Sequence, residues 1–273
     1  MSKTWFITGT SSGFGRLMTE KLLARGDTVV ATLRRTGALD DLRTQYADRL
    51  DVVELDVTDS AAVRRTVDAA FAAHERIDVV VSNAGYGLFG AAEELTDEQI
   101  RRQIDTNLIG SMQLIRAALP HLRTQGGGRI LQVASEGGQY AYPGFAAYHA
   151  TKWGIEGFVE SVAQEVAPFG IGMTLLEPGG ARTEFRYGSA RVAELMPIYD
   201  DTPAHSFLRM LDPESGLAPR RPVAHGRAHH RERGRGARTA AHGARRTGAG
   251  EHRDDAARAD RRLRGVDRAR RFH

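Results

Sequence analysis

The sequence predicts an α/β protein in which a doubly wound parallel sheet forms a single domain that ends in an atypical Arg/Ala/Gly-rich tail. Three observations predict this. Short apolar runs alternate with helical segments as far as residue 180, and such alternation is typical of βαβ units with right-handed crossovers. A glycine-rich turn separates the first run from the first helix. After residue 216 both periodicities end.

Six runs are predicted to be strands, and several are apolar throughout, as strands covered on both faces tend to be. They are Trp5–Thr8, Thr28–Leu33, Leu50–Leu55, Ile77–Ser82, Gly128–Ala134 and Gly172–Glu177. The predicted helices lie near 14–25, 38–47, 60–74, 97–122 and 147–168. Asp59 or Ser60 can cap the third helix, and Thr96 with Gln99 matches a capping box for the fourth.

Composition sets the broad class. The chain has 273 residues, 41% hydrophobic, and no cysteine, so disulfides and thiolate metal sites are excluded. No apolar run approaches the roughly 20 residues that cross a bilayer, and the first residues lack the features of a signal peptide. We therefore expect a cytoplasmic protein without a metal site.

Three segments follow from the pattern. Residues 1–185 are predicted to form a dinucleotide-binding and catalytic domain, and residues 186–216 a substrate lid of that domain, because the periodicity loosens there. Residues 217–273 are predicted to be a basic low-complexity tail. They hold 17 Arg, no Lys and 6 acidic residues, a net charge of +11, so the preceding 216 residues carry −7.

The tail has two interpretations. It is a basic arm for nucleic acid or an anionic membrane, or it is translated out of frame, since GC-rich DNA read in a shifted frame gives Arg, Ala, Gly, Pro and His. Few large apolar residues are present, so disorder is expected. Aromatic interleaving for base stacking is absent, which favours the second interpretation and predicts neither a nucleic-acid nor a membrane partner. Resequencing across codons 210–225 with mass spectrometry distinguishes the two.

The turn Thr8-Gly9-Thr10-Ser11-Ser12-Gly13-Phe14-Gly15 follows the first strand and begins the first helix. Glycines allow a tight turn and close approach to a pyrophosphate, which the helix N-terminus favours. The serines add hydroxyl donors or an N-cap. In this context the turn predicts a phosphate cradle, the alternative being an ordinary tight loop.

Arg34 and Arg35 follow the second strand, where an acidic residue would bind the adenosine ribose. Because Arg accommodates a 2′-phosphate, this pair favours NADP(H) over NAD(H). The alternative is two solvated arginines at a helix start.

Tyr148 and Lys152 stand four residues apart, thirteen residues after Ser135. On a helix they share one face. A free phenol has a pKa of ~10, and we expect the ammonium to lower it. With a serine hydroxyl to hold a substrate oxygen, the trio predicts proton transfer to a carbonyl or from an alcohol.

Together these residues make the chain resemble the short-chain dehydrogenase/reductase family, in its single-domain branch with a Rossmann fold, over residues 3 to about 185. The segments Ala31-Thr32-Leu33-Arg34 and Glu177-Pro178-Gly179 resemble those of NADP-preferring hydroxysteroid- and retinol-dehydrogenase-like ketone reductases. The matching positions are Gly9, Gly13 and Gly15 in the cofactor turn; Asp56 and Val57 at the adenine; Asn83, Ala84 and Gly85 after the fourth strand; Asn107, Ser135, Tyr148 and Lys152 as the tetrad; and Pro178, Gly179 and Thr183 beside the nicotinamide.

The resemblance implies a mechanism. Tyr148 would be the acid in reduction and the base in oxidation, Lys152 would lower its pKa and hold the nicotinamide ribose, and Ser135 would orient the substrate oxygen. Asn107 would support a water relay to Lys152. His149 has no role in the family and is expected in packing or the pocket wall, and Trp153 in the core. Family members continue with a further helix and an edge strand, which residues 217–273 do not predict.

The leading hypothesis is an NADP(H)-dependent ketone reductase or alcohol dehydrogenase, acting in the reductive direction on a small or ring-bearing substrate, in specialised metabolism. The expected substrate pocket comprises Gly137, Tyr140, Tyr142, Phe145, Tyr187, Met196 and Tyr199. The alternatives are a non-catalytic dinucleotide-sensing regulator and an enzyme impaired by its tail. A homodimer through the helices near 97–122 and 147–168 is expected.

Overall fold

The computed structural model describes residues 2–179, 188–212 and 226–228, and all of these lie in the first compact unit of the chain, Met1–His230. Its main sheet has the strand order β3-β2-β1-β4-β6-β7-β9. The first six strands are parallel, which confirms the predicted doubly wound sheet.

The strands of this sheet are β1 Thr4–Thr8, β2 Thr28–Leu33, β3 Leu50–Glu54, β4 Val79–Ser82, β6 Gly128–Val133, β7 Ile171–Leu176 and β9 Gly226–Ala228. The helices are α1 Gly13–Arg25, α2 Asp40–Gln45, α3 Ser60–Ala73, α4 Asp97–Ile104, α5 Gly110–Thr124, α6 Ala146–Val166 and α8 Phe207–Leu211. Strands β5 Leu88–Phe89 and β8 Arg191–Val192 form a separate two-stranded parallel sheet.

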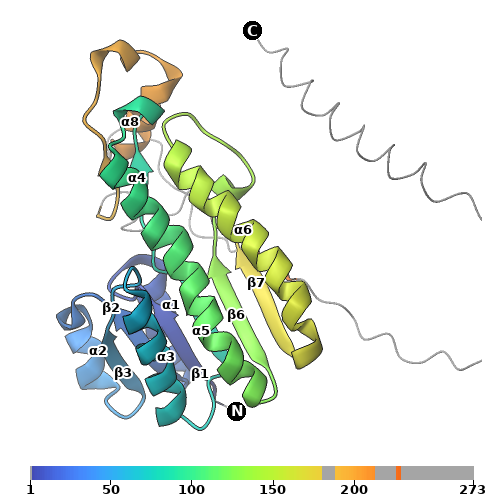
Figure 1. Ribbon diagram of the computed structural model, residues 1–273. Coiled ribbons are helices and arrows are strands. Elements are labelled where there is room, and N and C mark those ends of the chain that lie inside the picture. Colours follow the sequence, from blue (N-terminus) through green and yellow to red (C-terminus); the bar gives the residue numbers. More distant parts are fainter. Residues whose placement is uncertain (1, 180–187, 213–225, 229–273) are drawn as a thin grey trace, which may run out of the picture. The chain divides into compact units, whose positions relative to one another are not determined.

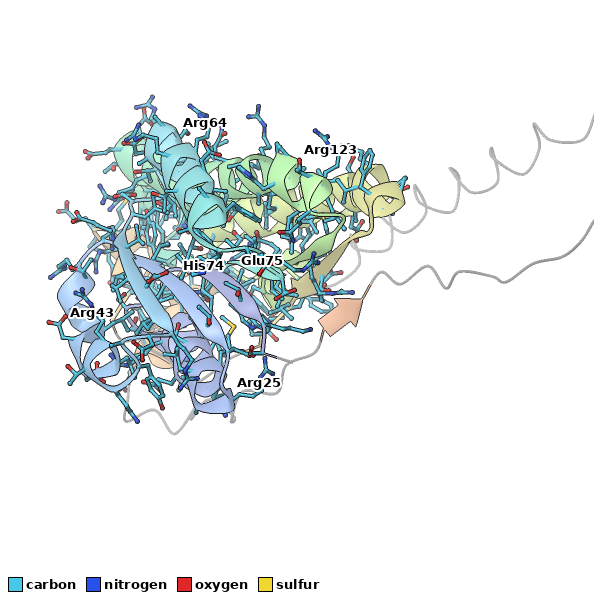
Figure 2. All side chains as sticks on the ribbon, turned by 90° about the horizontal axis from the view of Figure 1, so that it is seen from below. Arg25, Arg43, Arg64, His74, Glu75 and Arg123 are labelled. Atoms are coloured by element: carbon cyan, nitrogen blue, oxygen red, sulfur yellow. The ribbon has the colours of Figure 1, made fainter. Side chains whose placement is uncertain are left out.

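Helices cover both faces of the sheet. Helices α3, α5 and α6 pack on one face and α1 with α2 on the other (Figure 1). Successive residues of β1 point to opposite faces of the sheet. Phe6 packs in the core under α3, α5 and α6, Ile7 packs in the core under α1 and α2, and both are fully buried. Exposed arginines of these layers point outward, among them Arg64 on α3 and Arg25 on α1 (Figure 2).

Local signals place the helix starts. The Asp59 carboxylate accepts hydrogen bonds from the backbone N–H groups of Ala61 and Ala62, both at 2.9 Å. Thr96 and Gln99 form the predicted capping box on α4. Both caps satisfy backbone donors that the first helical turn leaves unpaired.

Two predictions need correction here. The single helix expected over 97–122 is divided by a π-helical turn, Asp105–Ile109, between α4 and α5. No strand was expected after residue 216, yet β9 pairs antiparallel with β7 at the sheet edge. Three residues with little apolar character can pair through the backbone alone, which sequence periodicity does not reveal. The rest of the tail, 229–273, lies outside the described residues.

Candidate active site

The glycine-rich turn between β1 and α1 leaves space for a ligand at the carboxyl ends of the parallel strands. Gly9 has φ +71°, and a Cβ there would lie 2.8 Å from the Cα of Ala84. A Cβ on Gly15 would collide with the carbonyl of Gly9. Ser12 is the N-cap of α1 and makes no side-chain capping bond, so the donors at the helix start face an anion site. These features fit a dinucleotide pyrophosphate.

Asn83 fastens the end of β4 to this turn. Its Nδ2 donates to the carbonyl oxygens of Thr8 and Gly9 at 2.8 and 3.0 Å, and its backbone N–H donates to Thr8 Oγ1 at 3.0 Å. The amide of Ala84 donates to the same hydroxyl at 3.1 Å. The cradle is therefore fixed by hydrogen bonds that link β1 with β4, where the strand order reverses direction.

A cavity of about 950 Å³ runs from this turn to α6. Most of the predicted cofactor residues line it: Gly9, Ser11, Ser12, Gly13, Phe14, Arg34, Arg35, Asp56, Val57, Asn83, Ala84, Gly85, Tyr148, Lys152, Pro178 and Gly179. Gly15 and Asn107 stand behind the lining, and Thr183 lies outside the described residues.

Charged groups mark the end of the cavity beyond β2. Arg34 and Arg35 are exposed there, and neither guanidinium group is held by a hydrogen bond or an ion pair within the described part of the chain. Asp56 accepts hydrogen bonds from the backbone N–H and the hydroxyl of Thr58, at 3.0 and 2.8 Å. Burial raises the pKa of Asp56, but these bonds outweigh it and hold the pKa below its usual value.

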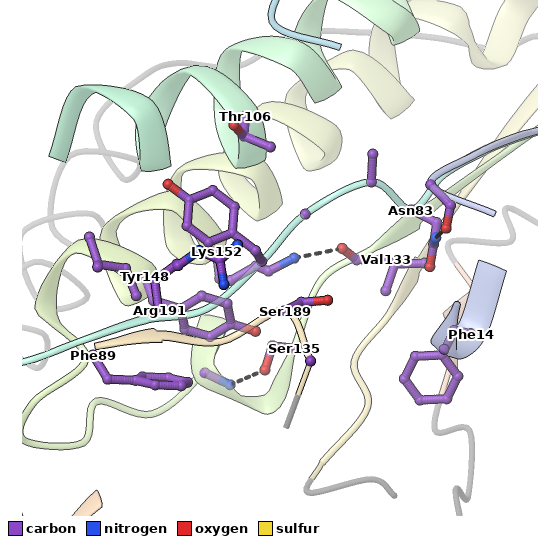
Figure 3. Close-up of a pocket in the computed structure, with 18 of the residues that line it drawn as sticks. Phe14, Asn83, Phe89, Thr106, Val133, Ser135, Tyr148, Lys152, Ser189 and Arg191 are labelled. Carbon is purple, nitrogen blue, oxygen red and sulfur yellow. Dashed lines mark hydrogen bonds between the residues drawn. The ribbon is translucent and has the colours of Figure 1, made fainter. Parts of the chain in front are cut away.

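The three expected proton-transfer residues meet at the other end of the cavity (Figure 3). Ser135 follows β6, and Tyr148 and Lys152 occupy the first two turns of α6. The Tyr148 hydroxyl and Ser135 share a hydrogen bond. The Lys152 Nζ donates to the carbonyl oxygen of Val133 at 2.9 Å. All three side chains therefore converge where β6 ends.

Lys152 was expected to lower the pKa of Tyr148, but it is not among the groups that shift this pKa, and the net shift is upward. Burial raises the pKa of Tyr148 to about 12, against the hydrogen bond with Ser135 and with the help of the negative charges of Glu136 and Glu156. Burial also lowers the pKa of Lys152 to about 8. Near neutral pH the phenol therefore holds its proton.

Glu156 adds a buried acid one helical turn after Lys152. Its side chain is 5% exposed, and burial together with repulsion from Glu177 raises its pKa to about 7. Gln139 donates a hydrogen bond to one of its carboxylate oxygens, and the other has no hydrogen-bond partner among residues 2–179, 188–212 and 226–228. Sequence reasoning missed this residue, although its i+4 spacing from Lys152 was visible.

Asn107 lies in the π-helical turn and is 2% exposed. Its side chain accepts a hydrogen bond from the N–H of Tyr86 at 3.0 Å and donates to the Tyr86 carbonyl at 2.9 Å. Its own backbone carbonyl accepts a bond from Ser111 Oγ at 3.0 Å. The side chain thus fixes the segment after β4 behind the cavity, as single π turns at functional sites often do.

The substrate side of the cavity matches the prediction in part. Gly137, Tyr142 and Phe145 line it. Tyr140 is 67% exposed and points to solvent. Met196 and Tyr199 lie off the cavity, because the Met196 amide is bonded to Glu94 and the Tyr199 hydroxyl to Glu93. Tyr187 lies outside the described residues.

Sequence reasoning missed several lining residues that come from residues 188–212 and from the segment between β4 and the end of β5. They are Tyr86, Leu88, Phe89, Gly188, Ser189, Arg191, Val192, Ser206 and Phe207. Phe207 packs with Phe89 and Phe145, with ring centres 5.9 and 6.2 Å apart. A single aromatic residue in a five-residue helix carries no periodic signal, so nothing in the sequence indicates that Phe207 lines the cavity.

A buried pair fastens this lid to the body. The Glu94 carboxylate accepts hydrogen bonds from the backbone N–H groups of Ala91 and Met196, at 2.6 and 2.7 Å, and it lies 2.7 Å from His205 Nε2. Burial raises the pKa of Glu94, but these bonds lower it below its usual value. Strand β8 pairs with β5 beside this anchor, and the two ends of residues 188–212 line the cavity through Gly188, Ser189, Arg191, Val192, Ser206 and Phe207.

The fold and this site define a dinucleotide-binding oxidoreductase class, and comparison with known proteins identifies the family. The short chain dehydrogenase family matches residues 3–191. Oxidoreductase BOA17 of Botryotinia fuckeliana is 41% identical over 217 residues, 79% of each chain. A 3-ketodihydrosphingosine reductase of Bacteroides thetaiotaomicron is 34% identical over 220 residues, 79% of this chain and 78% of that protein. The chain belongs to the short-chain dehydrogenase family.

Solved structures agree with this assignment. A short-chain dehydrogenase from Streptomyces avermitilis has a TM-score of 0.70 at 39% identity and covers 80% of this chain and 86% of its own. ElxO with NADP bound has a TM-score of 0.64 at 28% identity, covering 67% and 76%. A Burkholderia phymatum enzyme in complex with NAD has a TM-score of 0.64 at 28% identity, covering 68% of each chain.

Proposed function

We propose that the protein is an NADP(H)-dependent oxidoreductase that interconverts a ketone and a secondary alcohol, acting in the reductive direction on a small or ring-bearing substrate. One observation carries the proposal. The buried, protonated Tyr148 phenol and Ser135 stand together at one end of the cavity whose other end is the glycine cradle.

The proton transfer follows from the environment of Tyr148. A phenol with a pKa of about 12 keeps its proton until negative charge develops on a substrate oxygen beside it. Ser135 would hold that oxygen and stabilise the charge. Lys152 would bind the nicotinamide ribose, and Asn107 would support the relay that returns the proton. The nicotinamide, when bound, supplies the hydride.

The preference for NADP(H) rests on Arg34 and Arg35. Both guanidinium groups are exposed at the cavity mouth, and no carboxylate among the described residues forms an ion pair with either of them. A 2′-phosphate suits such a pair, since Arg binds phosphate through charge-assisted hydrogen bonds. The bound NADP of ElxO supports this preference, and the NAD of the Burkholderia protein shows that the family uses both.

The substrate class rests on the cavity wall and on one relative. Phe89, Tyr142, Phe145 and Phe207 give the wall an aromatic surface that suits a ring or chain of apolar carbon. The similarity to a 3-ketodihydrosphingosine reductase supports reduction of a ketone. We place the reaction in specialised metabolism because of the GC-biased composition, with only 3 Lys against 18 Arg before residue 217.

The alternatives are weaker. A dinucleotide-sensing regulator has no need of a buried tyrosine and lysine that converge with a serine on a cavity, so the site favours an enzyme. We propose a cytoplasmic homodimer through the helices around α5 and α6. Trp153 on α6 is 53% exposed rather than buried as expected, and an exposed indole on that face suits a subunit contact.

No helix among the described residues is long and apolar enough to cross a membrane.

The proposal is tested by binding and turnover. Fluorescence titration gives the affinities for NADPH and NADH, and loss of NADPH absorbance is followed over a panel of cyclic and aromatic ketones. We expect NADPH to bind at least about tenfold more tightly and at least one ketone to be reduced. Arg34→Ala should remove the difference between cofactors, with Arg43→Ala as an exposed control. Equal affinities overturn the cofactor preference, and a panel without turnover overturns the ketone assignment.

A further inference from the structure

His149 is held at both ring nitrogens. Its Nδ1 lies 2.7 Å from the carbonyl oxygen of Gly137, and its Nε2 lies 2.8 Å from the backbone nitrogen of Tyr142. A backbone N–H can only donate, so Nε2 must accept and Nδ1 must carry the ring proton. The imidazole is 7% exposed, and it is therefore fixed as one neutral tautomer.

Both contacts fall on the substrate loop, residues 135–145, that connects β6 to α6. The ring packs against Tyr142 and Phe145, with centres 5.5 and 5.7 Å apart. A Cβ on Gly137 would lie 3.0 Å from the ring, so the loop backbone lies close against the imidazole. His149 thus joins the first turn of α6 to two points of the loop that lines the cavity.

The two contacts lead to different parts of the site. The Gly137 carbonyl accepts from His149, and the Gly137 N–H donates to Ser135 Oγ at 3.1 Å. Ser135 is bonded in turn to Tyr148. The first contact therefore supports the hydroxyl that would hold the substrate oxygen. The second supports Tyr142 and Phe145, which form part of the aromatic wall.

We propose that His149 is a positioning residue with two separable functions: its Nδ1 fixes Ser135 through Gly137, and its Nε2 fixes the aromatic wall through Tyr142. The inference rests on the proposed ketone reduction for its kinetic consequences, whereas the two anchors stand on geometry alone. A displacement of about 1 Å at a reacting group can cost on the order of 100-fold in rate. A displaced wall weakens substrate binding instead.

Conservative substitutions separate the two functions. In His149→Asn the side-chain amide nitrogen replaces Nδ1 and keeps the Gly137 anchor. In His149→Gln the amide oxygen replaces Nε2 and keeps the Tyr142 anchor. His149→Leu removes both, and Arg43→Ala, on an exposed site of α2, is the control. The full chain is used throughout, with NADPH and the ketone from the panel that the wild type reduces fastest.

We expect His149→Asn to raise KM about tenfold with kcat nearly unchanged. His149→Gln should lower kcat about tenfold or more with a smaller change in KM, and His149→Leu should show both effects. The Kd for NADPH should stay within about twofold in all variants. Identical kinetics for the Asn and Gln variants, or wild-type kinetics for the Leu variant, would overturn the inference.

Hydrogen exchange provides a readout that does not depend on the ketone. In His149→Leu the amides of residues 137–145 should exchange at least about tenfold faster, while those of residues 155–166 keep wild-type rates. His149→Gln should retain protection at Tyr142. Unchanged exchange in His149→Leu overturns the positioning role even if no ketone is reduced, and altered exchange without turnover rejects only the proposed function.

Discussion

The ammonium nitrogen of Lys152 lies 5.7 Å from the centre of the Tyr148 ring and donates its hydrogen bond to the Val133 carbonyl. Both groups are buried, and burial disfavours the charged form of each, which raises the pKa of the phenol and lowers that of the amine. Near neutral pH the Tyr148 phenol is therefore neutral, and the Lys152 ammonium group loses its proton more readily than that of a free lysine.

The glycine cradle predicts a loss of cofactor binding on a minimal change. Gly9→Ala forces a side chain into the left-handed region and against Ala84. We expect NADPH affinity to fall at least about 100-fold, measured by fluorescence titration. Ala69→Gly, at an exposed site of α3, is the control; it should lower the unfolding free energy by about 0.5–1 kcal/mol and leave NADPH affinity unchanged. Wild-type affinity in Gly9→Ala contradicts the cradle.

Glu94 predicts a pH-dependent anchor for the lid. Its folded-state pKa lies below the ordinary value of 4.5, so its contribution to stability is present above that value and is lost as the pH falls through the folded pKa. Glu94→Gln should lower the free energy of unfolding by about 1–3 kcal/mol at pH 7, and by less at pH 4, in urea denaturation. Glu98→Gln, exposed on α4, should change it by under about 0.5 kcal/mol. If the unfolding free energies of Glu94→Gln and wild type differ more at pH 4 than at pH 7, this account is contradicted.

Glu156 predicts the opposite dependence. Its folded-state pKa of about 7 lies above the ordinary 4.5, so the folded protein holds a proton that the unfolded chain releases, and stability falls as the pH rises from about 5 to 8. The unfolding free energy of Glu156→Gln minus that of wild type should therefore rise by about 1–3 kcal/mol as the pH rises across that range. Glu98→Gln, at an exposed site of α4 that does not shift the pKa of Glu156, should show no such trend, and a flat Glu156→Gln difference would refute the prediction.

Phe207 predicts substrate selectivity. It is 2% exposed and lines the cavity against Phe89 and Phe145. Phe207→Leu should raise the kcat/KM for a bicyclic ketone about tenfold relative to that for a monocyclic ketone. The reason is that the smaller leucine side chain enlarges the substrate end of the cavity. Phe169→Leu, at a 47% exposed aromatic site, should leave the ratio unchanged. An unaltered ratio in Phe207→Leu removes this residue from the substrate wall.

The sequence predicted the sheet and the catalytic end of the site for physical reasons. Strands such as Val79–Ser82 are buried at every position, so their apolar character is continuous, and the site residues follow strand ends or helix starts. The lid was predicted only as a segment. Glu94 meets Met196 and His205 across 102 and 111 residues, and no local period indicates such pairs. The raised pKa of Tyr148 depends on burial that spacing cannot show.

The most direct test of the central claim is single-turnover oxidation of bound NADPH by a ketone in wild type and in Tyr148→Phe, from pH 6 to 9. The account predicts that NADPH binding is retained in the variant and that the rate falls about 100- to 10,000-fold. The wild-type reduction rate should not follow a phenol ionisation in this range, since the pKa of Tyr148 is about 12. A Tyr148→Phe variant that oxidises NADPH at the wild-type rate would contradict the account.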